Sequence, residues 1–226
     1  MTTVTGHRGA GALAPENTLA SFRTALECGV DAIEFDVRET ADGELIVIHD
    51  DTLGRTTDGR GQVSETALTE IATLDAGDGE RVSTLEDVLE YVLESGVRPR
   101  IEFKERGLGE RVLEQIVERG FAERTTFSSF DKEALDGLGN SAVSIGFISF
   151  AVTDDALETV ERLGAESLFV SLDSVTAADL ERARTHHVEV GVWTVNSVEG
   201  IERALDFGVD LITSDRLDMV LEQVRE

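Results

Sequence analysis

The sequence is poor in three residue types: cysteine, proline and lysine. Its 226 residues include one cysteine, two prolines and two lysines. The single cysteine, Cys28, excludes an internal disulfide and favours a cytoplasmic protein. With so little proline there is no Pro/Ser-rich linker, so we expect one domain over residues 1–226. A chain of this length can bury a substantial core.

Long apolar runs are also missing. No run approaches the roughly 18 residues of a membrane-spanning helix. The opening segment, residues 1–6, has no basic stretch followed by an apolar one. We therefore expect no stable membrane insertion and no signal peptide.

Positive charge is scarce as well, with 20 basic against 46 acidic residues and a formal net charge of −26 at pH 7. Such a field repels nucleic-acid phosphates and anionic membrane surfaces, so we expect no nucleic-acid partner. The acids are spread along predicted helices, which is typical of a solvated acidic shell suited to high salt. No pattern predicts an oligomeric state, and any basic residue near a strand end becomes informative.

Strand-like and helix-like segments alternate along the chain. Apolar periodicity predicts strands at Thr3–Gly6, Ala32–Val37, Leu45–His49, Arg100–Phe103, Thr125–Ser128, Val143–Ile148, Ser167–Val170, Glu189–Thr194 and Asp210–Thr213. It predicts helices at Asn17–Cys28, Thr84–Glu94, Leu108–Arg119, Lys132–Leu138, Asp154–Leu163, Ala177–His186, Val198–Phe207 and Leu217–Val224. Roughly eight alternations in a chain of this length predict an α/β fold, a (β/α)8 TIM barrel. The alternative is an open doubly wound sheet, but its usual G-x-G-x-x-G after the first strand is absent.

One segment departs from the alternation. The strands at Ala32–Val37 and Leu45–His49 are separated by ETADGE, in which Asp42-Gly43 favours a hairpin turn. We expect no helix between them. The following stretch, residues 54–81, has little periodicity and is expected to form a loop insertion with a short helix.

Carboxylates alternate with apolar residues in two of the predicted strands. In AIEFDV, Glu34 and Asp36 share one strand face about 7 Å apart, where they repel by about 2 kcal/mol at an effective dielectric near 20. If buried, they need a counter-charge such as a divalent cation; the alternative is a solvent-facing edge strand. In RIEFKE, Glu102 and Lys104 share a face, which a simple ion pair would also explain. Because the pattern recurs at C-terminal strand ends, where barrel sites lie, it favours a metal site.

Two histidines fall at the same predicted mouth of the barrel. His7 follows the first strand and His49 ends the third predicted strand. With pKa values near neutrality, such a pair can act as general acid and general base. Arg8 supplies a fork of donors suited to phosphate oxygens. The adjacent histidines at 186–187 end an acidic helix and are expected to lie at the surface.

The motifs HRG, PENT, EFDV, TADG, VIHDDTLGRTT, STLEDVL, IEFK, SSF and WTVN follow one another from Gly6 to Asp215. This series resembles the glycerophosphodiester phosphodiesterase family, barrel enzymes related to phosphatidylinositol phospholipase C. The resemblance implies metal-dependent hydrolysis of a small-molecule glycerophosphodiester to sn-glycerol 3-phosphate and an alcohol. In the closing strand, VDLITSDR has Leu211 and Ser214 where the family commonly has glycine and threonine.

The resemblance also implies a role for individual residues. His7 and His49 would be the catalytic acid–base pair. Glu34, Asp36 and Glu102 would hold one divalent cation, Mg²⁺ or Ca²⁺. The substrate and its phosphate would be bound by Arg8, Lys104, Glu16, Asn17 and Trp193. The alternatives are a lysophospholipase D-like activity on lipids, which a broad apolar patch at the mouth would favour, and a non-catalytic barrel that binds a phosphate ligand.

Overall fold

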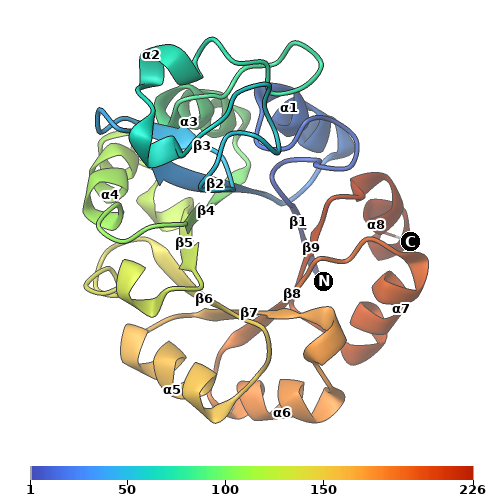
Figure 1. The fold of residues 1–226 in the computed structure, drawn as a ribbon. Coiled ribbons are helices and arrows are strands. Elements are labelled where there is room, and N and C mark those ends of the chain that lie inside the picture. Colours follow the sequence, from blue (N-terminus) through green and yellow to red (C-terminus); the bar gives the residue numbers. More distant parts are fainter. Residues whose placement is uncertain (1, 226) are drawn as a thin grey trace.

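Eight parallel strands form a closed barrel at the centre of the molecule, and a ninth strand lies outside it (Figure 1). The computed structural model describes residues 2–225. Its strands are β1 (Thr3–Gly6), β2 (Ala32–Glu39), β3 (Leu45–Val47), β4 (Arg98–Phe103), β5 (Thr126–Ser129), β6 (Ser144–Ser149), β7 (Ser167–Ser171), β8 (Glu189–Trp193) and β9 (Leu211–Ser214). The order β1-β9-β8-β7-β6-β5-β4-β2 is closed by the pairing of β1 with β2. The predicted TIM barrel is confirmed, and the open sheet is excluded.

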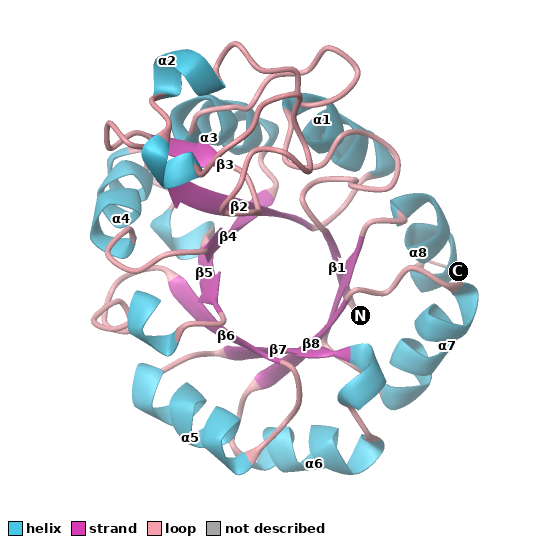
Figure 2. Ribbon diagram, in the orientation of Figure 1, coloured by secondary structure: helices cyan, strands magenta, loops and turns pink. Residues whose placement is uncertain are grey.

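Helices surround the barrel on its outside (Figure 2). They are α1 (Leu19–Cys28), α2 (Leu68–Ile71), α3 (Leu85–Ser95), α4 (Gly109–Glu118), α5 (Asp154–Leu163), α6 (Ala177–Thr185), α7 (Val198–Phe207) and α8 (Leu217–Val224). None of the helices within residues 2–225 has the length and apolar character needed to cross a membrane. With one exception, the predicted elements lie within two residues of the observed ends.

The exception is the helix predicted at Lys132–Leu138, which is wrong. Only a three-residue 3₁₀ turn, Lys132–Ala134, forms there. Gly137 has a φ of 83°, which carries the chain away from a helical path. Apolar periodicity misled the prediction because Leu135 and Leu138 are nevertheless buried against the core.

The hairpin and the insertion are both confirmed. β3 runs antiparallel to β2, with Val37 opposite Val47, and Gly43 takes a φ of 85° in the turn. The insertion that follows contains a 3₁₀ turn (Val63–Glu65) and the short helix α2. Together with β3 and the residues at its two ends, it buries a second, small apolar cluster: Ile46, Ile48, Leu53, Val63, Ile71, Ala76 and Val82.

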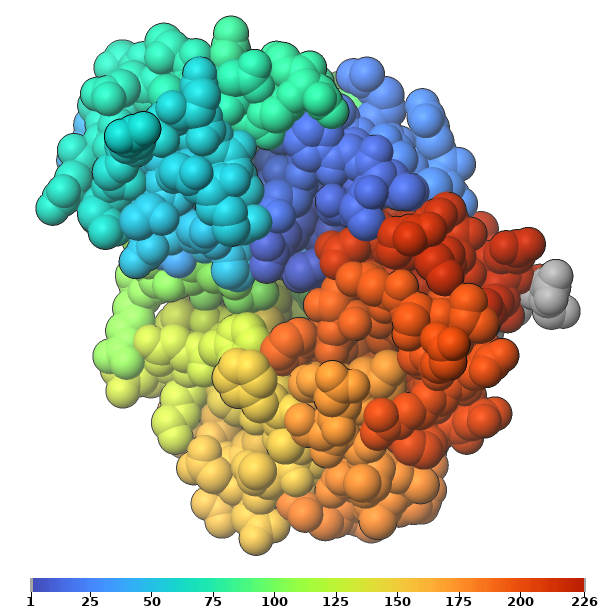
Figure 3. All heavy atoms as spheres, turned by 45° about the vertical axis from the view of Figure 1, so that its right-hand side comes forward, coloured from blue at the N-terminus to red at the C-terminus, as the bar shows by residue number. Residues whose placement is uncertain are grey.

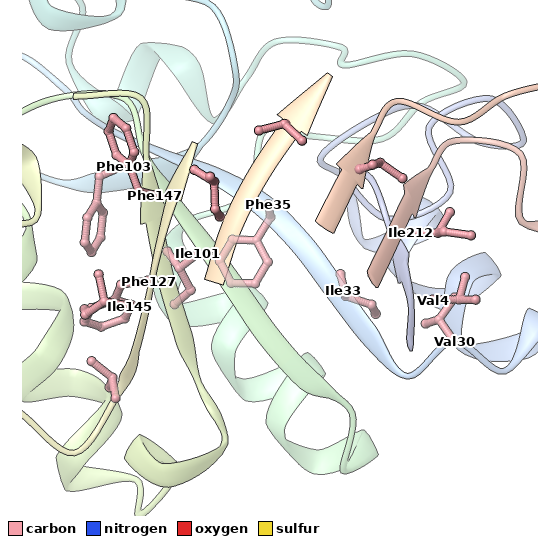
Figure 4. Packing of buried hydrophobic residues seen from close by; sticks show 14 of the residues in the cluster. Val4, Val30, Ile33, Phe35, Ile101, Phe103, Phe127, Ile145, Phe147 and Ile212 are labelled. Atoms are coloured by element: carbon pink, nitrogen blue, oxygen red, sulfur yellow. The ribbon is translucent and has the colours of Figure 1, made fainter. Parts of the chain in front are cut away.

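The main core lies between the barrel strands and the helices. Apolar side chains on the outer faces of the strands fill it (Figure 4). Phe35 of β2 packs on Phe22 of α1 with ring centroids 5.8 Å apart, and Phe103 of β4 packs on Phe127 of β5 at 4.9 Å. Since side chains alternate along a strand, the residues on either side of Phe35 and Phe103 point into the barrel. This places Glu34, a neighbour of Phe35, on the inner face.

Candidate active site

Three buried carboxylates meet inside the barrel. Glu34 and Asp36 come from β2 and Glu102 from β4, and each offers an oxygen within 4.8 Å of the others. In the register of these strands, Asp36 lies directly opposite Glu102. The solvent-facing alternative for Glu34 and Asp36 is wrong, because each side chain is about 1 % exposed.

Two cations balance part of this negative charge. Lys104 Nζ lies 3.0 Å from Asp36 Oδ1 and also pairs with Glu102. Arg8 Nε lies 3.3 Å from Asp36 Oδ2, and the Arg8 backbone N–H donates to Glu34 Oε2 at 2.8 Å. The ion pair between Glu102 and Lys104 that was an alternative to a metal site therefore exists inside the carboxylate cluster.

The carboxyl groups of the cluster differ in their pKa values. Burial raises the pKa of Glu102 to about 7, with the negative charge of Asp36 adding to the effect. Burial acts on Asp36 as well, but the charges of Lys104 and Arg8 hold its pKa at about 2. Glu34 Oε1 is buried and has no hydrogen-bond partner among the described residues. The unpartnered Glu34 oxygen and the raised pKa of Glu102 both indicate that the cluster has too little positive charge around it. A divalent cation, which prefers oxygen ligands, would supply that charge.

Glu16 and Asn17 lie behind this cluster. The Asn17 amide donates to Asp36 Oδ2 at 2.8 Å, and Asn17 adopts a φ of 58°. Glu16 accepts a hydrogen bond from Arg8 Nη1 at 2.7 Å. Neither residue lines the central cavity described below. Their contacts position Asp36 and Arg8.

His7 is held by a carboxylate from the far end of the chain. Its Nδ1 lies 2.7 Å from Asp215 Oδ1, and Asn196 Nδ2 donates to Asp215 Oδ2 at 2.7 Å. Burial alone would lower the pKa of His7. The hydrogen bond to the Asp215 carboxylate and the charge of Glu34 outweigh burial, and the pKa of His7 is raised.

His49 has a similar arrangement with the opposite result. Its Nδ1 lies 2.6 Å from Asp50 Oδ1. Burial, together with the positive charges of Lys104 and Arg8, lowers the pKa of His49, although Asp36 and Asp50 oppose the shift. Two titratable groups with pKa values moved apart form a suitable acid–base pair.

Both histidines line a central cavity of about 290 Å³ at the C-terminal ends of the strands. One side of the cavity is polar and includes Glu102 and Lys104; the other is lined by Phe130, Ile148, Phe150, Phe169 and Trp193. Phe130, Phe150 and Trp193 form a three-ring cluster with centroids 5.3–5.7 Å apart. Phe150 is 69 % exposed, so the apolar side of the cavity opens to solvent.

Sequence reasoning misses several residues of this site. Asp215 directly follows β9, and Phe130 and Phe150 each follow a serine that ends β5 or β6. Their signal is position, because residues just beyond C-terminal strand ends collect at one face of a barrel. Arg55, inside the VIHDDTLGRTT motif, has no such signal. The predicted surface position of His186 is confirmed by its exposed pairing with Glu161.

The fold and the site together define a (β/α)8-barrel enzyme with its polar residues at the C-terminal strand ends. The chain belongs to the glycerophosphoryl diester phosphodiesterase family, whose sequence model matches residues 7–219. It is thus a phosphoric diester hydrolase.

Relatives match over the full length of the chain. The glycerophosphodiester phosphodiesterase of Caldanaerobacter subterraneus subsp. tengcongensis is 35 % identical, covering 100 % of this chain and 98 % of its own. A solved glycerophosphodiester phosphodiesterase from Agrobacterium tumefaciens is 31 % identical with a TM-score of 0.86, covering 98 % of this chain and all of its own. An Oleispira antarctica phosphodiesterase, solved in complex with the product sn-glycerol-3-phosphate, is 27 % identical with a TM-score of 0.92, covering 100 % of this chain and 98 % of its own.

Proposed function

We propose that the chain hydrolyses glycerophosphodiesters to sn-glycerol 3-phosphate and an alcohol, with one divalent cation, Mg²⁺ or Ca²⁺, held by Glu34, Asp36 and Glu102. The observation that carries this proposal is the buried carboxylate cluster, whose member Glu102 lines the same cavity as both histidines. The product bound to the Oleispira antarctica relative supports the glycerol phosphate half of the substrate.

The residues in and next to the cavity have different roles in binding the substrate in this proposal. Arg8 and Lys104 line the polar side, where their N–H groups bind phosphoryl oxygens. A bound cation would offset further charge on these oxygens. Trp193 packs against the glycerol or the leaving-group side of the substrate. Glu16 and Asn17 bind the substrate only indirectly, through the positions of Arg8 and Asp36.

The two histidines move the protons. Each turns its Nδ1 toward a carboxylate, which leaves Nε2 for the substrate. One histidine removes a proton from the attacking hydroxyl as its oxygen bonds to phosphorus, and the other protonates the alcohol as its bond to phosphorus breaks. Two attacking groups fit this scheme. Attack by the glycerol 2-hydroxyl gives a cyclic phosphate that water then opens, whereas direct attack by water gives the product in one step. A substrate lacking the 2-hydroxyl distinguishes the two routes, since only direct attack by water still cleaves it.

The proposal is tested by glycerol 3-phosphate release from glycerophosphocholine and glycerophosphoethanolamine, in molar salt, with Mg²⁺, Ca²⁺ or chelator. We expect Glu34→Ala and chelator to abolish release, and His7→Ala or His49→Ala to lower turnover by about 10² or more. Glu39→Ala, on the same strand but outside the cluster, and His186→Ala are the matched controls. Release that persists in chelator would contradict the metal site, and near-normal turnover in both histidine variants would remove them from the mechanism.

A second candidate function, a lysophospholipase D-like activity, is favoured by the exposed three-ring cluster at the mouth. An acyl chain laid on Phe150 would cover apolar surface worth about 1.5–3 kcal/mol when buried. If lysophospholipids are substrates, Phe150→Ala raises KM for lysophosphatidylcholine about tenfold or more and leaves glycerophosphocholine unchanged. Equal KM values for the lipid in both proteins would rule out this role of the aromatic cluster.

A further inference from the structure

A single guanidinium in the insertion bridges two acidic side chains at the rim of the site. Arg55 Nε donates to Asp50 Oδ2 at 2.6 Å, and Arg55 Nη1 donates to Glu16 Oε2 at 2.9 Å. Its third nitrogen, Nη2, donates to both acids, at 3.0 Å to Asp50 Oδ1 and 2.8 Å to Glu16 Oε1. In the space-filling view the insertion (cyan to teal) lies against the N-terminal segment (blue) (Figure 3).

These two acids are the ones that position the catalytic histidine and the phosphate-binding arginine. Asp50 Oδ1 contacts His49, and Glu16 Oε1 accepts from Arg8. The same two oxygens are the ones bound by Arg55 Nη2. Arg55 therefore lies one carboxylate away from His49 on one side and from Arg8 on the other.

The geometry points to Arg55 as a positioning residue that fixes His49 and Arg8 relative to each other through Asp50 and Glu16. This inference rests on the proposed roles of those two residues in phosphodiester hydrolysis. The planar fork of a guanidinium can bind both oxygens of two carboxylates at once, whereas an ammonium cannot. Hence Asp50 and Glu16 each keep one side-chain rotamer, and so do His49 and Arg8, which they contact.

The insertion holds the backbone of Arg55 in place. Leu53 is about 1 % exposed within the second apolar cluster, and its carbonyl accepts from both the backbone and the hydroxyl of Thr57. Arg55 lies between these two residues in the sequence, so the loop that carries the guanidinium is anchored in this apolar cluster. The insertion thus acts on the site through this contact.

The test compares Arg55→Ala and Arg55→Lys with the wild type in kcat, KM and melting temperature. Arg162→Ala is the matched control, because Arg162 forms a similarly exposed ion pair with Asp136 away from the cavity. We expect Arg55→Ala to lower kcat about tenfold or more and to raise KM, since small displacements of catalytic groups are costly. Arg55→Lys should restore only part of the loss, and Arg162→Ala should change neither constant.

A double-mutant cycle separates positioning from general loss of structure. In an Asp50→Ala/Glu16→Ala background, Arg55→Ala should add less than about twofold, since both side chains through which it reaches the site are then absent. A full additional loss there, or unchanged constants in the single variant, would overturn the inference. If the effects track a fall in melting temperature and Arg55→Lys restores nothing, the inference is likewise overturned.

A readout without substrate keeps this inference separate from the proposed function. In ¹⁵N-histidine NMR of the wild type, the ring N–H of His49 at Nδ1 should show a strong hydrogen bond to Asp50, and Arg55→Ala should weaken it. The protein has only four histidines, so the signal can be assigned with His49→Ala. An unchanged His49 signal in Arg55→Ala overturns the positioning role, whereas a wild type that cleaves no glycerophosphodiester overturns only the proposed function.

Discussion

At the level of single residues, neighbouring charges distinguish the pKa values of the two histidines. Burial lowers the pKa of both His7 and His49. At His7, Asp215 and Glu34 raise the pKa by more than burial lowers it. At His49 the neighbouring cations Lys104 and Arg8 reinforce burial. The two imidazoles are therefore distinguished by their neighbours and not by their own chemistry.

Asp215→Asn tests this account. The substitution removes a negative charge that raises the pKa of His7, and it replaces a charge-assisted hydrogen bond by a weaker neutral one, so that pKa should fall. His7 then loses its proton at lower pH, and the limb of the pH–rate profile that it controls should move to lower pH. NMR titration of His7 measures the change directly, with the exposed Asp218→Asn as control. An unmoved His7 titration would contradict the assignment.

At the level of elements, one wall of the cavity depends on two strand glycines. They make room for Phe169, which lines the cavity. The Phe169 ring from β7 lies between Gly146 of β6 and Gly191 of β8, and a Cβ at either glycine would come within 2.4–2.5 Å of the ring. The Arg100 guanidinium stacks above the same ring, 4.3 Å from its centroid. These glycines give the ring its space inside the barrel.

Gly191→Ala should therefore destabilise the barrel by about 1–3 kcal/mol, the usual cost of overpacking a core. Urea unfolding measures this loss. Gly54→Ala is the control, since the nearest atom to its added Cβ is 3.6 Å away. Equal stability of Gly191→Ala and the wild type would mean that Phe169 can move aside without cost.

At the level of the whole molecule, repulsion among acids opposes folding. The formal charge of −26 is spread over a surface on which most ion pairs are exposed and therefore weak. Inside the barrel the balance differs, because buried carboxylates are matched by buried cations such as Lys104. Salt should therefore act on the surface far more than on the site.

We expect the melting temperature to rise by several degrees when KCl is increased from about 0.1 M to about 2 M, because the Debye length falls from about 10 Å to below 3 Å. Chelator is present throughout, so that binding of divalent cations contributes nothing. A melting temperature that is constant or falls over this range would show that surface repulsion does not limit stability.

The sequence by itself determined the barrel, nearly all of its elements and the residues of its carboxylate cluster. Periodicity of two places Glu34 and Asp36 on one strand face, and a C-terminal strand end places His7 and His49 at one mouth. Where local pattern and backbone conformation disagree, as at Lys132–Leu138, sequence reasoning fails because glycine φ values are not visible in periodicity.

Only the tertiary structure decided which groups touch. Asp215 meets His7 across 208 positions of sequence, and Arg55 meets Glu16 across 39. Such contacts depend on the closure of the barrel and on the packing of the insertion, neither of which leaves a local period in the chain. The physical reason is that hydrogen bonds and charge pairs act over a few ångströms in space, whatever the distance along the backbone.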